Sequence, residues 1–105
     1  MEIAEEYADE VTIVDVSGRI DSNTAKALAD KLSNLIDAGR TRITVNLEQV
    51  EYISSAGFRV LLVGSRRAEE ANGKLILCGL SADIQKLFDV TAFTDLFEIH
   101  PSRPV

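Results

Sequence analysis

The sequence predicts a single α/β domain with a mixed, mostly parallel β-sheet and the element order β-β-α-β-α-β-α-β. Short apolar or alternating segments, typical of strands, take turns with stretches whose apolar residues recur every three or four positions, as in amphipathic helices. Parallel strands joined by helices form one sheet with right-handed crossovers. Because 105 residues suit one compact domain, we expect a single domain over 1–105, with a core at about 3–100 and a loose tail over 101–105.

The chain begins with a predicted hairpin. Residues 3–7 and 11–16 are rich in apolar side chains, and Asp9 and Glu10 between them favour a turn. The first strand is therefore expected to run antiparallel to the second. An acidic cluster at this end is typical of a solvent-exposed edge strand or hairpin. Its members are Glu2, Glu5, Glu6, Asp9 and Glu10.

A helix and a strand are predicted next. Apolar residues spaced three and four apart predict a helix from Ala25 to Ile36, which Gly39 ends. Good N-cap residues precede this helix at positions 21–23. Apolar and polar residues then alternate over 43–47, which predicts a strand.

The second half of the chain repeats this alternation. A helix that follows Ser55 is closed by the Asn-Gly pair at 72–73, and an apolar strand comes directly after it. Ser81 or Asp83 then caps a short helix. The last apolar piece, 96–99, is compatible with either a strand or a docked helical turn.

Composition argues against two classes of partner. A net charge of −6 disfavours general nucleic-acid binding, which requires a basic face. No apolar run is long enough to span a bilayer, and the acidic start does not resemble a signal peptide. We therefore expect a soluble, cytosolic protein with no direct nucleic-acid or membrane partner.

The sequence contains few residues that could carry catalysis. His100, beside a proline-rich tail, is expected to be solvent-exposed, and Cys78 is expected to be a small core residue on a strand. One histidine and one cysteine cannot build a zinc site of familiar spacing. Glycine-rich nucleotide-binding motifs and the acidic cluster of a response-regulator receiver are also missing. We therefore expect no enzyme active site and no cofactor.

The most informative segment is 45–62, where an apolar strand breaks into Ser-Ser-Ala-Gly and then continues as a helix. The break places Ser54 and Ser55 at a helix N-terminus, whose unpaired amides and partial positive charge favour a phosphate or another anion. A simpler interpretation is that one of these serines only caps the helix.

Two motifs on these elements resemble STAS domains, specifically the bacterial anti-sigma factor antagonists. The segment VEYISSAGFRVLL, at 50–62, is similar to the family signature of a strand, Ile or Met, Asp-Ser-[Ser/Thr/Ala]-Gly and an apolar helix. The segment VSGRID, at 16–21, resembles the family segment before the first helix. The element order also agrees, so the resemblance covers residues 3–100. Aligned through Ala56 and Gly57, Ser55 takes the place of the phosphorylatable serine.

One position departs from the family pattern: Ser54 stands where the family usually carries Asp. Serine can also shape or cap the turn, but it lacks the charge of Asp. A STAS adaptor without phosphorylation, for example beside a lipid-transport ATPase, is therefore an alternative to a phosphorylated switch. An unrelated enzyme or nucleotide binder of the same architecture is a third interpretation.

The resemblance implies a partner that is both an anti-sigma factor and a serine kinase with a histidine-kinase-like ATPase fold. The unmodified antagonist would bind this kinase and free a sigma factor. Phosphorylation of Ser55, with Ser54 as the alternative acceptor, would end the interaction, and a PP2C-type phosphatase would restore it. Because ATP and magnesium belong to the kinase, this chain would need no cofactor.

The expected partner-binding face combines the start of the second helix with the loop before the first helix, because neighbouring parallel strands lead into both segments. Arg59 lies one turn from Ser55 and could pair with a phosphate there. Asp21 is either an N-cap or a direct contact, and Gly57 either admits a partner backbone or nucleotide phosphate or eases helix packing. The candidate residues are Gly18, Arg19, Asp21, Ser22, Asn23, Ser54, Ser55, Ala56, Gly57, Phe58 and Arg59.

Overall fold

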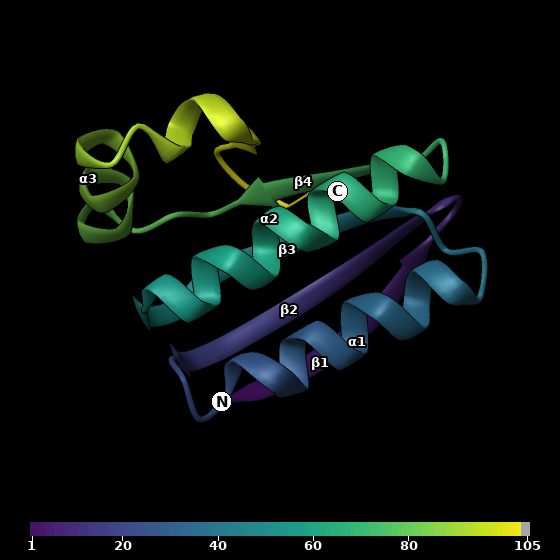
Figure 1. Ribbon diagram of the computed structural model, residues 1–105, viewed down its shortest axis with the longest axis horizontal. Coiled ribbons are helices and arrows are strands. Elements are labelled where there is room, and N and C mark those ends of the chain that lie inside the picture. Colours follow the sequence, from purple (N-terminus) through teal and green to yellow (C-terminus); the bar gives the residue numbers. More distant parts are fainter. Residues whose placement is uncertain (104–105) are drawn as a thin grey trace.

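Within residues 1–103, which the computed structural model describes, five strands form one sheet in the order β1-β2-β3-β4-β5. Figure 1 shows the helices that connect them. This architecture confirms the predicted fold class and element order. The elements are β1 (Glu2–Ala8), β2 (Val11–Ile20), α1 (Ala25–Asp37), β3 (Arg42–Ile53), α2 (Ser55–Glu70), β4 (Lys74–Cys78), α3 (Ala82–Val90), the 3₁₀ helix η1 (Phe93–Leu96) and β5 (Glu98–His100).

The sheet is mixed, as the sequence pattern predicted. Strand β1 pairs antiparallel with β2, and the turn between them places Asp9 at φ 56°. Strands β2 to β5 pair in parallel. Helices α1 and α2 lie side by side over one face of the sheet, and no helix covers the other face in residues 1–103 (Figure 1). No helix in this part of the chain is long and apolar enough to cross a membrane.

The ends of α1 show where local signals predict boundaries well and where they do not. Gly39 adopts φ +85°, and the Arg40 amide donates to the Leu35 carbonyl at 2.8 Å, which is the helix-ending motif that the glycine predicted. At the other end α1 begins at Ala25, as predicted, but its N-cap is Thr24 and not one of residues 21–23, and Thr24 makes no side-chain capping bond. Residues 21–23 instead form a separate turn, so the predicted caps act before the helix proper.

The boundaries between α2 and α3 follow their predicted signals, whereas β2 runs beyond the predicted 11–16 as far as Ile20. Ser81, one of the two candidate caps, accepts a hydrogen bond from the Ile84 amide at 3.2 Å and starts α3. Asn72, at φ 63°, closes the turn after α2. The final apolar piece is both of the alternatives in succession, because η1 ends at Leu96 and β5 begins at Glu98.

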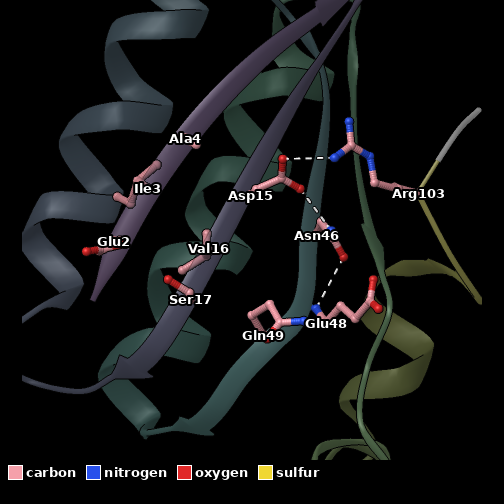
Figure 2. A pocket seen from close by; sticks show the side chains of 10 residues that line it. All are labelled: Glu2, Ile3, Ala4, Asp15, Val16, Ser17, Asn46, Glu48, Gln49 and Arg103. Carbon is pink, nitrogen blue, oxygen red and sulfur yellow. Dashed lines mark hydrogen bonds and ion pairs between the residues drawn. The ribbon is translucent and has the colours of Figure 1, made fainter.

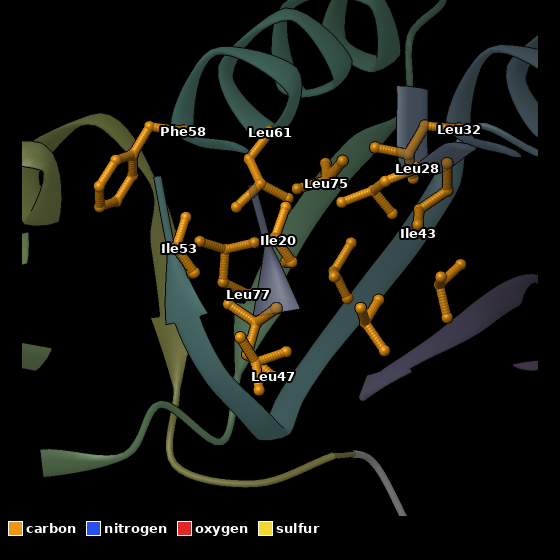
Figure 3. Close-up of a cluster of buried hydrophobic side chains, with 14 of the residues drawn as sticks. Ile20, Leu28, Leu32, Ile43, Leu47, Ile53, Phe58, Leu61, Leu75 and Leu77 are labelled. Carbon is orange, nitrogen blue, oxygen red and sulfur yellow. The ribbon is translucent and has the colours of Figure 1, made fainter. Parts of the chain in front are cut away.

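The face of the sheet beneath α1 and α2 contributes to the apolar core (Figure 3). Val14, Val45 and Leu77 lie opposite one another in neighbouring strands, and all three are fully buried. Leu28 of α1 and Leu61 of α2 are buried against the same core. Because a buried aliphatic side chain stabilises the fold by roughly 1.5–3 kcal/mol relative to an exposed one, this face holds α2 firmly in place.

The opposite face carries polar and charged side chains. Asp15 of β2 lies beside Asn46 of β3. The Arg103 Nη1 lies 3.1 Å from the Asp15 carboxylate, and the Nη2 of the same guanidinium pairs with Glu6. Arg103 belongs to the segment predicted as a loose tail, so the chain as far as this residue is held against the sheet. Residues 104 and 105 of that predicted tail lie outside the described residues.

Candidate functional site

The two segments expected to form one face do lie side by side. Strands β2 and β3 are parallel neighbours, and their last residues, Ile20 and Ile53, are partners in the register. The Ser54 amide donates to the Ile20 carbonyl at 2.8 Å, which joins the start of α2 to the end of β2. The sheet therefore brings residues 18–23 and the N-terminus of α2 to the same edge of the molecule.

The structure separates the roles of the two adjacent serines. The Ser54 side chain accepts a hydrogen bond from the Gly57 amide at 3.3 Å, so Ser54 is the N-cap of α2. Ser55 is the first residue of the helix and is exposed to solvent. The amides of Ser55 and Ala56 donate to no acceptor within residues 1–103, as is usual for a first helical turn. Ser55 thus presents its hydroxyl where a negative charge is favoured.

The loop after β2 is shaped by its own hydrogen bonds. The Asp21 carboxylate accepts from the amides of Asn23 and Thr24 at 2.9 and 3.2 Å. The Thr24 hydroxyl donates to the Arg19 carbonyl at 2.8 Å. Asp21 therefore acts mainly as the capping group of this turn, while Asn23 and its neighbour Ser22 remain exposed. Such a turn gives the exposed side chains a defined position.

A cation is held at the end of β2 and β3. The Arg19 guanidinium lies 4.3 Å from the centre of the Tyr52 ring, and its Nε lies 3.8 Å from the Asp21 carboxylate. Both contacts favour the charged side chain in this position. Sequence reasoning did not select Tyr52, because its position opposite Arg19 depends on the register of β2 and β3, which the sequence pattern did not predict.

Two of the candidate face residues are buried. A Cβ on Gly57 would lie 2.7 Å from Ile20 Cγ2 and 2.9 Å from Ile53 Cγ2, so the glycine allows α2 to approach the sheet. This contact supports the packing role of Gly57 and not the approach of a partner. Phe58 is 7% exposed, and its ring packs edge-on against Phe88 at a centroid distance of 4.9 Å. Burial in the core explains why neither side chain lies on the open surface.

Arg59 lies on the exposed surface of α2 and forms no ion pair within residues 1–103. It lines a hollow of 280 Å³ together with Ser55, Phe58, Leu62 and Phe97. Phe97 follows η1 and is far from α2 in the sequence, so no local pattern could place it beside Ser55. The candidate face thus includes an apolar wall that sequence reasoning missed.

A second hollow, of 620 Å³, lies on the face of the sheet that no helix covers (Figure 2). Asn46 donates to Asp15 at 2.8 Å and accepts from the Glu48 amide at 3.2 Å. Arg103 closes this network from the C-terminal segment. Asp15, Asn46 and Arg103 each have a hydrogen-bond partner in this network, so these three side chains are held in place at the hollow.

The single cysteine and the single histidine of the chain lie on neighbouring strands in different surroundings. Cys78 is buried on β4, and burial raises the pKa of its thiol above the ordinary value, which keeps it in the weakly nucleophilic form. His100 lies on β5, where its ring nitrogen is 2.7 Å from a Glu98 carboxylate oxygen. Within residues 1–103, no group of three or more His, Cys, Asp or Glu residues could hold a metal ion.

Two bacterial proteins named as anti-sigma factor antagonists are similar to this chain in sequence. The chain is 30% identical over 103 residues to BtrV of Bordetella bronchiseptica, named as an anti-sigma factor antagonist, with 98% of this chain and 89% of that protein covered. It is 36% identical over 93 residues to the anti-sigma-B factor antagonist of Staphylococcus aureus, with 88% and 85% covered.

Solved structures share the fold at lower sequence identity. An anti-sigma factor antagonist from Mycobacterium paratuberculosis superposes with a TM-score of 0.86 at 23% identity, covering 96% of this chain and 86% of the other. Unphosphorylated SpoIIAA superposes with a TM-score of 0.77 at 23% identity, covering 97% and 90%. The sequence model of the STAS domain matches residues 2–104. The chain therefore belongs to the STAS domain family and groups with its bacterial anti-sigma factor antagonists.

Proposed function

We propose that this chain is an anti-sigma factor antagonist that binds a serine-kinase anti-sigma factor and so frees a sigma factor. Phosphorylation of Ser55 ends this interaction. The observation that carries the proposal is that the two serines at the start of α2 differ: Ser54 caps the helix, and the adjacent Ser55 is exposed. The names of the relatives agree with this function, and SpoIIAA, which shares the fold, has been solved in a phosphorylated form.

A phosphate on Ser55 would be compatible with the folded chain. It would add a charge of about −1.5 to −2 at neutral pH beside the positive end of the α2 dipole, which favours a negative charge by roughly 0.3–1 kcal/mol. Within a protein interface, the same charge beside acidic groups or without a partner costs several kcal/mol. A cost of about 3 kcal/mol corresponds to about a hundredfold weaker binding. The phosphate therefore releases the partner by electrostatic and steric effects, without a large change in fold.

The other parts of the cycle belong to other proteins. The kinase supplies ATP and magnesium, and a PP2C-type phosphatase removes the phosphate from Ser55. This chain then acts as a regulatory binding module that is a substrate and not an enzyme. It needs no cofactor of its own for either state.

Intact-mass spectrometry after incubation with ATP, magnesium and the genomically neighbouring kinase-like protein tests this proposal. We expect one added phosphate, mapped to Ser55 and absent from the Ser55→Ala variant. Ser54→Ala is the matched control, because loss of a cap destabilises the protein by about 0.5–2 kcal/mol but leaves the acceptor hydroxyl in place. A phosphate mapped to Ser54 would contradict the assignment of the acceptor.

A second function is favoured by Ser54 itself, which is uncharged where the family signature has Asp. In this alternative the chain is a STAS adaptor that is never phosphorylated, for example beside a lipid-transport ATPase. Stable binding to the kinase-like protein without modification would speak for an adaptor role. Co-purification with an ATPase and a permease would identify that role directly.

A further inference from the structure

An apolar hollow lies directly beside the proposed phosphoacceptor. Ser55, Phe58, Arg59 and Leu62 of α2 form one wall, and Phe97 forms the other. Phe97 is held there by Phe88, whose ring centre lies 5.9 Å away, and Phe88 in turn packs against Phe58. The wall is therefore fixed by aromatic contacts between segments that are distant in the sequence.

Arg59 provides an available positive charge at this hollow. Two other arginines are engaged in ion pairs, since Arg67 pairs with Asp37 at 2.9 Å and Arg103 pairs with Asp15 at 3.1 Å. Arg59 is exposed and has no ion-pair partner in residues 1–103, although the chain as a whole has a net charge of −6. A free guanidinium at the rim of an apolar hollow is complementary to a segment that presents an apolar side chain next to a carboxylate.

We propose that the kinase partner inserts an apolar side chain between Leu62 and Phe97 and pairs a carboxylate with Arg59. This inference rests on the proposed function, because it assigns that partner to the surface beside Ser55. The small volume of the hollow, 280 Å³, fits one side chain and not an extended ligand. Arg59 lines both this hollow and the groove between α1 and α2, whereas Leu62 lines only the hollow and Val63 lines only the groove.

Arg59 would also increase the loss of affinity that phosphorylation of Ser55 causes. Ser55 and Arg59 are four residues apart on α2, so their side chains are neighbours on the helix surface. A phosphate on Ser55 would form charge-assisted hydrogen bonds with Arg59 within the same molecule, where the effective concentration is high. The partner's carboxylate would lose its cation and face a new negative charge in the same place. Phosphorylation thus removes an attraction and adds a repulsion.

The affinity of the unphosphorylated protein for its kinase, measured with point variants, tests the contact. We expect Arg59→Gln to weaken binding by about tenfold or more, because a charge pair at an interface is lost. Arg66→Gln is the matched control, since Arg66 is also an exposed arginine of α2 without an ion pair in residues 1–103. Leu62→Lys should likewise weaken binding, whereas Val63→Lys, on the other side of Arg59, should not.

A combination of variants tests the exchange of partners by Arg59. Phosphorylation of Ser55 should weaken binding by about a hundredfold in the unaltered chain but by only about tenfold in the Arg59→Gln background. If phosphorylation lowered the affinity equally in both backgrounds, Arg59 would not move from the partner's carboxylate to the phosphate, and this part of the proposal would be overturned.

Binding that neither Arg59→Gln nor Leu62→Lys weakens would overturn the contact while leaving the proposed function intact. If the unaltered chain does not bind the kinase, both proposals fail. Because Arg59 is exposed and unpaired, its variant tests the contact even if Leu62→Lys unfolds.

Discussion

The two faces of the sheet are stabilised by different physics. The face beneath α1 and α2 is apolar, and Leu47, Leu61 and Leu77 on this side are fully buried (Figure 3). The opposite face has no helix over it in residues 1–103 and is held by a chain of polar contacts from Arg103 through Asp15 and Asn46 (Figure 2). Substitutions that change side-chain volume should therefore destabilise the first face most, and substitutions that remove a charge or a hydrogen bond should destabilise the second.

The candidate binding face lies where the covered face ends, and this position explains how a switch can be rigid and exposed at once. Helix α2 is fixed by its buried side, where Gly57 allows close contact with Ile20 and Ile53. Its exposed side presents Ser55 and Arg59 to a partner. A charge added to Ser55 therefore meets solvent or the partner, and the apolar core does not have to adapt.

The largest effect should come from adding volume on the covered face. Gly57→Ala places a methyl group 2.7 Å from Ile20 Cγ2 and 2.9 Å from Ile53 Cγ2, which are short branches with little freedom to move. We expect a loss of about 1–3 kcal/mol in the free energy of unfolding, measured by urea denaturation. Gly64→Ala is the control, because its Cβ would meet the flexible ends of Leu32 and Leu75 at 3.0 and 3.3 Å. If both variants were equally stable, the packing role of Gly57 would be wrong.

A smaller effect is expected from the polar network of the open face. Asn46→Ala removes the acceptor for the Glu48 amide and the donor to Asp15, and we expect it to cost about 1–2 kcal/mol in denaturation experiments at neutral pH. Asn46→Asp would place two carboxylates together, which raises the pKa of one of them in the folded state. The free energy of unfolding of Asn46→Asp should therefore be highest at acid pH and should fall as the pH rises through that raised pKa. A pH-independent loss in Asn46→Asp would argue against close contact with Asp15.

The smallest effect should come from the ion pairs of the C-terminal segment. Arg103 pairs with Glu6 and Asp15, but its side chain is 33% exposed, so solvent screens the interaction. We expect Arg103→Ala to destabilise the fold by no more than about 1 kcal/mol, and by less at high salt. Thermal denaturation at two salt concentrations measures this difference, with Arg66→Ala as an unpaired control. A loss that salt does not reduce would indicate packing by the arginine stem instead.

Much of the fold could be predicted because its signals are local. The spacing of apolar residues predicted α1 and α2, Gly39 marked the end of α1, and the alternation of strands with helices predicted the parallel sheet. These patterns depend on side chains within one or two turns of each other. Even so, the N-cap of α1 was placed too early, at positions 21–23, because Asp21 satisfies amides of a turn that precedes the helix.

Only part of the candidate site could be predicted from such local patterns. The Ser-Ser-Ala-Gly break located the start of α2, but the spacing of two adjacent serines could not separate the cap from the exposed hydroxyl. That distinction, like the burial of Gly57 under Ile20, depends on how α2 sits on the sheet. Phe97 beside Ser55 and Arg103 beside Asp15 join residues more than forty positions apart. Local patterns carry no information about such contacts, because chain topology and packing create them only when the whole domain folds.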